Sequence, residues 1–246
     1  MNASAADQGR LLEIAKLDER LAQLEHKAKS LPEHSEITTL DARAKVVGNL
    51  VVAAETECGD IGREVARAEI DVEQVRARAS RDESRLNSGQ GTPKELEALQ
   101  HEVVTLSRRQ AELEEVELEI LERLEQSQKY LAESQREAKE LSDTKLGLEA
   151  TRDAALAEIA KESSVAREMR GILASQIDPE FLALYTKISE SVKGIGAAEL
   201  HQRRCQGCRL EINATDIGRF REASPDEVLR CEECRRILIR TSTSGI

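Results

Sequence analysis

Apolar residues recur in alternating steps of three and four over most of the first 160 residues. This spacing places one narrow apolar stripe on the side of an α-helix, and such a stripe must be covered by a second helix. The pattern therefore predicts long coiled-coil helices. In the first arm the stripe consists of Ile14, Leu17, Leu21, Leu24, Ala28 and Leu31, and then of Ile37, Leu40, Ala44, Val47, Val51, Ala54, Cys58, Ile61, Val65, Ala68, Val72, Val75, Ala79 and Leu86.

A Gly-rich turn at residues 87–92 interrupts this stripe. Thr92 can cap a second helix, Pro93 suits its first position, and Glu95 can complete a capping box. One extra four-residue step near Ile120–Leu124 predicts a local change of supercoil. The second stripe consists of Leu96, Leu99, Val103, Leu106, Leu113, Val116, Ile120, Leu124, Leu131, Ala138, Leu141, Leu148, Ala155 and Ile159.

The two arms have similar lengths if Pro32 only kinks the first one. Equal arms around a short Gly-rich turn favour an antiparallel helical hairpin, because each stripe can then cover the other. An intermolecular dimer, in which the turn is only a hinge, is the alternative. The oligomeric state that we expect is a monomer or a weak dimer.

The composition supports helices and excludes a membrane protein. Ala, Glu, Lys, Arg and Leu make up roughly half of the chain, as in long helices. The net charge is −11, and residues 201–246 carry nine basic and seven acidic residues, so the acidic excess lies in the remaining chain. That acidity argues against contact of the helical part with DNA or an anionic membrane. Without an apolar run for a signal peptide or a membrane span, we expect a cytoplasmic protein with reduced thiols.

Two C-x-x-C pairs near the C-terminus predict a metal site. Cys205 and Cys208 form the first pair, Cys231 and Cys234 the second, and 22 residues separate the pairs. Two such knuckles can surround one Zn²⁺ with four thiolates. Iron uses the same ligands, but nothing else in the sequence indicates electron transfer, so zinc is favoured. Four protein ligands leave no open position, and we therefore expect a structural ion rather than a catalytic one.

The fold class expected is mainly α, a long antiparallel coiled-coil helical hairpin followed by a small C-terminal β zinc ribbon. The hairpin is expected at residues 1–177, and a short helix plus the ribbon at 178–246, with the ribbon itself at 201–240. The helix begins after Asp178 and is predicted to pack the ribbon against the base of the hairpin. Strands are expected at 210–212, 228–230 and 237–239, and a frayed tail at 241–246.

The sequence resembles bacterial C4-type zinc ribbon proteins with an N-terminal coiled-coil hairpin, a family of unknown function. The likeness rests on Thr92–Leu99 at the start of the second helix and on Cys205–Ile239, including Arg236-Ile237-Leu238. The family often has Gly after the fourth cysteine, where this chain has Arg235. The resemblance implies a hairpin with a ribbon, a binding role toward RNA, DNA or protein, with some members linked to transcription factors, and no established catalytic activity.

Basic residues around the cysteines are the candidate contacts for nucleic acid or a partner: Arg203, Arg204, Arg209, Arg230, Arg235, Arg236 and Arg240. The alternative is a solvated face that balances nearby acidic residues and the zinc thiolates. Cys58 is interpreted as a small buried residue, with an intermolecular disulfide or a redox sensor as alternatives. His201 is expected at the surface rather than on the metal.

These features together favour a non-enzymatic adaptor. In this hypothesis the hairpin docks proteins, and the ribbon contacts nucleic acid or a partner from transcription or translation. The alternative is a purely structural coiled-coil scaffold in which zinc only stabilises the ribbon. No catalytic constellation or nucleotide fingerprint occurs in the sequence.

Overall fold

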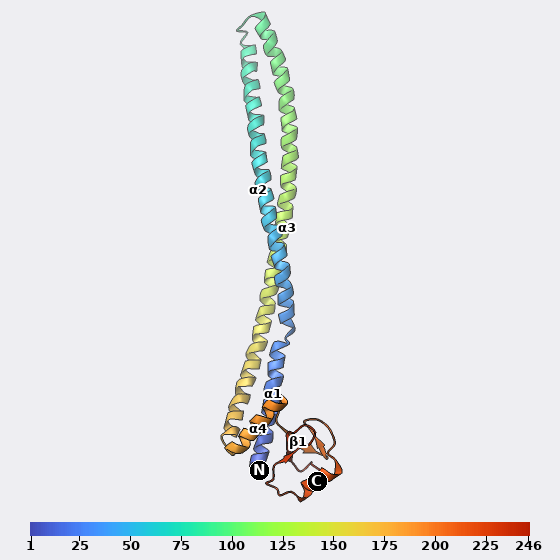
Figure 1. The fold of residues 1–246 in the computed structure, drawn as a ribbon. Helices are drawn as coiled ribbons and strands as arrows, with labels where there is room; N and C mark the ends of the chain where they lie inside the picture. Colours follow the sequence, from blue (N-terminus) through green and yellow to red (C-terminus); the bar gives the residue numbers. More distant parts are fainter. The chain divides into compact units, whose positions relative to one another are not determined.

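A computed structural model describes residues 1–246. Five helices and four short strands follow one another along the chain (Figure 1). The helices are α1 (Ala5–Lys29), α2 (Pro32–Asn87), α3 (Pro93–Ala174), α4 (Pro179–Val192) and α5 (Ala214–Glu222), and the strands are β1 (Ala197–His201), β2 (Arg204–Cys205), β3 (Leu229–Arg230) and β4 (Ile237–Arg240). None of the helices combines the length and the apolar character that crossing a bilayer requires.

The chain divides into two compact units. One contains Met1–His34 and Ala150–Ile246, and the other contains Ser35–Glu149. The domain boundary expected at 177/178 stays a prediction. The two compact units follow a different division, which places the N-terminal helix together with residues 150–246.

In the unit of residues 35–149, α2 and α3 form an antiparallel pair (Figure 1). The capping box forms as predicted: the Thr92 N–H donates to Glu95 Oε2 at 2.7 Å, and the Glu95 N–H donates to Thr92 Oγ1 at 3.4 Å. Ion pairs flank the contact between the helices, such as Arg43 with Glu137 at 2.6 Å. The intramolecular hairpin is thus confirmed.

The apolar stripe of α3 differs from the predicted one in register. Val116 is 47% exposed, whereas the neighbouring Glu117 is half-buried. Two serines, Ser127 and Ser134, are also buried at inward positions. With these polar residues included, the alternation of three and four is unbroken from Leu96 to Leu141, so the extra four-residue step was wrong.

In the other unit, a cluster of apolar side chains joins α4 and the ribbon to α1 and the end of α3. Asp178 caps α4 by accepting from the N–H groups of Glu180 and Phe181, both at 3.0 Å. The helix then buries its apolar face, as predicted. The cluster contains Leu11 and Ile14 from α1, Phe181, Tyr185 and Ile188 from α4, Ala197 from β1, and Ile237 and Ile239 from β4.

The ribbon is a four-stranded sheet with the order β2-β1-β4-β3. β1 pairs with β4 in parallel, and the two outer pairs are antiparallel. The strand expected at 210–212 was wrong, since only a single bridge joins Arg204 and Glu211 there. The tail is not frayed, because the N–H of Gln202 donates to Thr243 O and Ser244 Oγ donates to Leu200 O at 2.7 Å.

Candidate metal centre and its arginines

The four predicted cysteines converge on one point. All their sulfur atoms lie within 4.8 Å of one another. Sγ of Cys205 is 3.7 Å from Sγ of Cys234, and Sγ of Cys208 is 3.8 Å from Sγ of Cys231. A tetrahedral zinc ion with Zn–S bonds of about 2.3 Å has sulfur–sulfur edges of about 3.8 Å. The geometry therefore fits one Zn²⁺, and these distances are too long for disulfides, whose bonds are about 2 Å.

The two knuckles have the same backbone hydrogen bonds. The Arg209 N–H donates to Cys205 O at 2.7 Å, and the Arg235 N–H donates to Cys231 O at 2.8 Å. In each knuckle the first cysteine's own N–H donates to the carbonyl five residues later, at 3.0 and 2.9 Å. Each turn thus holds its two sulfurs on the same side, and the two turns together close the ligand set.

The surroundings of the sulfurs favour four thiolates only when a cation is bound between them. Burial raises the pKa of the Cys205 and Cys231 thiols. Burial also acts on Cys234, but hydrogen bonds from the backbone and side chain of Arg236 outweigh it and lower the pKa of that thiol to about 7. Four converging thiolates repel one another, and a divalent cation removes that repulsion. Because all four positions around the ion come from the protein, the zinc is structural.

A second apolar cluster positions both knuckles. The sheet covers the metal centre with Leu200 and Leu238, and α5 adds Ile217 and Phe220. Cys205 and Cys231 belong to the same cluster. Helix α5 was missed by the sequence analysis, although Asn213 caps it by accepting from the Asp216 N–H at 2.8 Å.

Four of the seven predicted arginines donate to backbone carbonyls: Arg203, Arg230, Arg236 and Arg240. Arg240 donates to four carbonyls, those of Ala223, Ser224, Pro225 and Glu227, at 2.5 to 3.1 Å. Its guanidinium therefore organises the loop before β3.

Arg203 and Arg230 each use Nε only. Arg203 donates to Gly245 O and Arg230 to Arg235 O, both at 3.2 Å. Their terminal nitrogens have no partner in the chain.

Four of the seven arginines lie close to the metal ligands. Arg204 precedes Cys205 and Arg235 follows Cys234, and both side chains are exposed without an intrachain hydrogen bond or ion pair. Arg209 and Arg236 instead line a cleft beside the first knuckle. Arg221, an exposed residue of α5, is a further basic side chain that was not among the predicted contacts.

The two remaining candidates lie outside the metal centre. His201 Nδ1 is 3.0 Å from Thr243 Oγ1 and is not a ligand. Cys58 is a half-buried residue of α2, and its Sγ is 3.0 Å from Ser127 Oγ on α3. It occupies the apolar stripe, as the sequence predicted.

A long antiparallel helical hairpin and a closed four-cysteine site define a class of protein, the helical hairpin with a C4 zinc ribbon. A family model described as the CT398-like coiled coil hairpin domain matches residues 14–193, and a C4-type zinc ribbon domain matches residues 204–238. The chain belongs to this CT398-like hairpin family and contains the zinc ribbon.

Relatives match the chain over nearly its whole length. An uncharacterized protein of Mycobacterium tuberculosis is 36% identical over 240 residues, 98% of each chain. A solved structure from Mycobacterium smegmatis is 34% identical with a TM-score of 0.83, and it covers 98% of this chain and 100% of that one. CT398 from Chlamydia trachomatis has a TM-score of 0.63 at 18% identity over 96% of this chain and 98% of its own, and this likeness shows the fold alone.

Proposed function

We propose that this protein is a non-enzymatic adaptor whose zinc ribbon binds the phosphate backbone of nucleic acid. The observation that carries the proposal is the pair of exposed, unpartnered arginines beside the metal centre. Arg204 and Arg235 flank Cys205 and Cys234, whose sulfurs are 3.7 Å apart. A guanidinium without an intramolecular partner is available for a phosphate, and Arg matches phosphate geometry with two parallel hydrogen bonds.

The backbone at Arg235 supports a functional role. Its φ is 62°, in the left-handed region. A side chain with a Cβ costs about 1–2 kcal/mol there, while Gly costs little. Backbone strain of this kind clusters at functional sites, where the surrounding structure holds it in place. At this position the side chain adds an exposed positive charge next to the zinc.

The distribution of charge directs an anion to the ribbon. Residues 201–246 carry nine basic and seven acidic residues, whereas the rest of the chain is strongly acidic. The acidic helices repel a nucleic acid, and only the ribbon can attract one. The closed zinc site offers no position for a substrate, which supports an adaptor rather than an enzyme.

The helix pair of residues 35–149 is the proposed protein-docking arm. It exposes apolar side chains that its own stripe does not cover, among them Val46 and Val52 on α2 and Leu118 and Leu121 on α3. Exposed apolar side chains favour protein contact when they cluster. Changing Leu118 and Leu121 to Lys should abolish cross-linking to a captured partner, while Glu119→Lys, a neighbouring change of charge, should not.

A structural scaffold is the second candidate function. The observation in its favour is the cluster of α1, α4, β1 and β4, which fixes the ribbon to helices of its own unit. In that case zinc and arginines serve only the fold. We place either function in the reducing cytoplasm, because zinc binding needs free thiolates. For either function we expect a monomer or a weak dimer.

An electrophoretic mobility shift over a salt series tests the nucleic-acid proposal. The probes are single-stranded and duplex RNA and DNA, at roughly 50 to 200 mM salt, where phosphate contacts weaken most visibly. The double variant Arg204→Gln/Arg235→Gly should bind about 10-fold more weakly, with a salt slope reduced by about one for each lost phosphate contact.

The matched control is Arg67→Gln/Arg81→Gln, which removes two exposed positive charges from α2 and should leave binding unchanged. Unaltered binding by the double variant, or no binding of any probe by the unaltered protein, would contradict the proposal. The second result, with zinc and fold intact, would favour the scaffold.

A further inference from the structure

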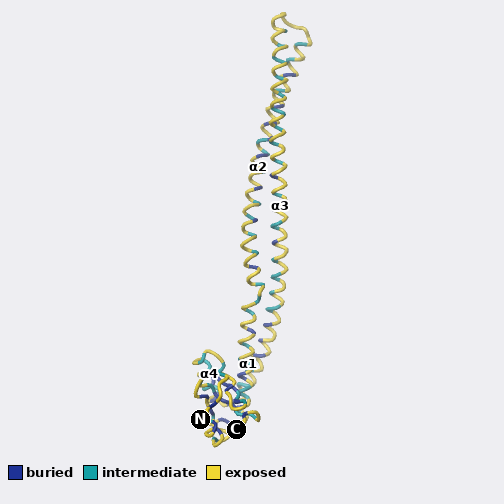
Figure 2. Tube along the Cα trace, turned by 90° about the vertical axis from the view of Figure 1, so that its right-hand side faces the viewer, coloured by how far each residue is buried: buried dark blue, intermediate teal, exposed yellow.

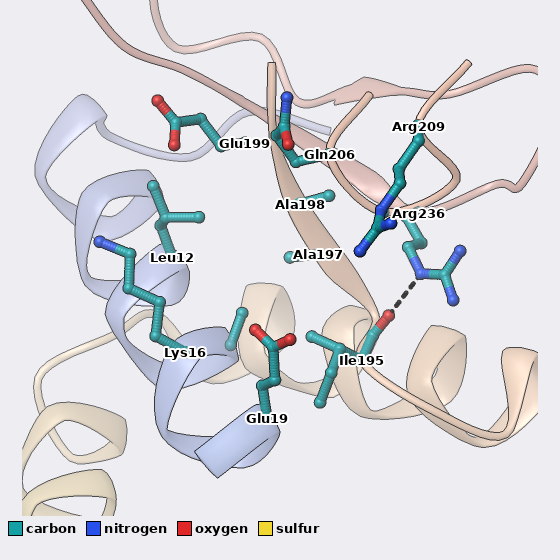
Figure 3. A pocket seen from close by; sticks show the side chains of 12 residues that line it. Leu12, Lys16, Glu19, Ile195, Ala197, Ala198, Glu199, Gln206, Arg209 and Arg236 are labelled. Carbon is teal, nitrogen blue, oxygen red and sulfur yellow. Dashed lines mark hydrogen bonds between the residues drawn. The ribbon is translucent and has the colours of Figure 1, made fainter. Parts of the chain in front are cut away.

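A cleft of about 410 Å³ lies between α1, the start of β1 and the zinc knuckles (Figure 3). Its floor is apolar and consists of small side chains, including Ala15, Ala197 and Ala198. Charged side chains surround this floor, and they come from segments far apart in the sequence. The volume falls within the range of clefts that hold small molecules, about 300–1,000 Å³.

Each zinc knuckle contributes one arginine to the cleft. Arg209 follows the first knuckle with a left-handed φ of 65°, and Figure 3 shows its guanidinium turned into the cleft. Arg236 follows the second knuckle, and its Nε donates to Ile195 O at 2.8 Å. That bond fixes the half-buried side chain, whose guanidinium also hydrogen-bonds to Cys234, whereas the Arg209 guanidinium has no partner in the chain. No carboxylate of the chain forms an ion pair with either arginine.

Gly207 makes room for this arrangement. A Cβ at this position would lie 2.6 Å from Arg236 Cδ and 3.1 Å from the Ala198 side chain. A larger residue at position 207 would push the Arg236 side chain away from the knuckle, where it lines the same cleft as Arg209. The two guanidiniums thus form a fixed cationic wall.

The other side of the cleft has acceptors. Glu199 lines it, held by the hydroxyl groups of Thr241 and Thr243, which both donate to Oε1 at 2.8 Å. Burial raises the pKa of Glu199, but these two hydrogen bonds, together with the charges of His201 and of Lys16, which also lines the cleft, outweigh it and lower the net pKa, so the carboxylate is ionised at neutral pH. Glu19 adds a second exposed carboxylate (Figure 3). Hydroxyl or amine groups of a ligand can donate to these oxygens.

We propose that this cleft binds a small phosphomonoester that also carries hydroxyl or amine groups, the chemistry of sugar phosphates and mononucleotides. The unpaired Arg209 guanidinium, with the positive charge of Arg236 beside it, matches a phosphate dianion better than a singly charged carboxylate. The carboxylates opposite them match the polar end of the same molecule. This site goes beyond the nucleic-acid proposal, which depends on Arg204 and Arg235 outside the cleft.

Isothermal titration calorimetry of the full zinc-loaded protein tests the proposal. The probe is ribose 5-phosphate, and the comparison probes are inorganic phosphate, ribose and succinate at the same ionic strength. Ribose 5-phosphate should bind saturably and at least about 10-fold more tightly than inorganic phosphate, because it uses both sides of the cleft. Ribose and succinate should show no saturable heat. Equal or tighter binding of succinate, or no saturable binding of ribose 5-phosphate, would overturn the proposal.

Two arginine variants separate the cleft from general electrostatics. Arg209→Gly removes a guanidinium from the cleft and suits the left-handed backbone, so the fold should persist and affinity should fall about 10-fold or more. Arg221→Gln removes an exposed positive charge from α5, outside the cleft, and should leave affinity unchanged. Equal losses in both variants would show that only the overall charge matters and would reject the site. Arg236→Gln, checked for unchanged zinc content, should repeat the loss.

Discussion

Buried side chains are spread thinly along the helix pair of residues 35–149, whereas they gather tightly around the zinc ribbon (Figure 2). Along α2 each inward position meets one position of α3, as Cys58 meets Ser127, so every layer adds a small and independent contribution. In the ribbon, nine buried residues and one metal centre must form together. The helix pair should therefore tolerate a local defect, while the ribbon should not.

Removing zinc should produce the largest effect, because it should unfold the ribbon and leave the helix pair folded. Structural zinc contributes about 10–16 kcal/mol of apparent binding free energy in zinc-finger peptides, and a ribbon this small cannot replace it with apolar burial. We expect chelation, or Cys231→Ser, to unfold residues 197–240 while most helical circular dichroism remains. Amide dispersion in NMR spectra measures the first change and far-ultraviolet circular dichroism the second.

The matched control is Cys58→Ser, a change of the same chemical kind outside the metal site. It should leave zinc content at one ion per chain and the ribbon signals unchanged. A ribbon that stays folded without metal would contradict the view that four sulfurs hold it together.

Shortening one buried side chain of the helix pair should have the next largest effect. This effect should stay confined to the neighbouring contacts between α2 and α3. Ile61 is only 4% exposed, and Ile61→Ala leaves a gap worth about 2–4 kcal/mol of unfolding free energy. Ile70, 56% exposed on the same helix, is the control, and Ile70→Ala should change stability by about 0.5 kcal/mol or less. Thermal unfolding of both variants measures the difference. A loss of zinc in Ile61→Ala would show that the two regions are coupled.

The junction of α4 and β1 offers a sharper comparison, because two glycines of one loop differ in their surroundings. A Cβ at Gly196 would lie 2.7 Å from Tyr185 O and 2.9 Å from Ser189 N, both backbone atoms that cannot move away. Gly196→Ala should destabilise the ribbon's unit by about 1–3 kcal/mol. At Gly194 the nearest atom is 3.8 Å away, and Gly194→Ala should be nearly neutral. Equal denaturation midpoints for the two variants would refute this account.

The helix pair was predictable because its signals are local in sequence. Apolar spacing, the Gly-rich turn and the Thr92–Glu95 capping box are each read within a few residues. The register was predicted less well, because polar residues such as Glu117 and Ser134 occupy inward positions. A search for apolar residues alone passes over them and assigns the position to Val116.

The metal centre was also predictable, whereas most of the surrounding ribbon was not. Two C-x-x-C pairs specify the ligands without any knowledge of the fold. β1 is rich in Ala, a poor strand former, and is stabilised by parallel pairing with β4, some 40 residues later. The role of Arg240 was hidden too, since its four carbonyl acceptors lie 13 to 17 residues before it.

The smallest predicted effect tests whether the polar residues of the stripe cost stability. Ser134 is 6% exposed, and Ser134→Ala should raise the unfolding free energy by about 0.5–1 kcal/mol, because Ala favours helix and buries no hydroxyl. Ser107→Ala changes an exposed serine of the same helix, so it reports the helix propensity alone. Denaturant midpoints should therefore rise more for Ser134→Ala than for Ser107→Ala. Equal rises would mean that burying this hydroxyl costs nothing, and that the inward serines are neutral parts of the coiled coil.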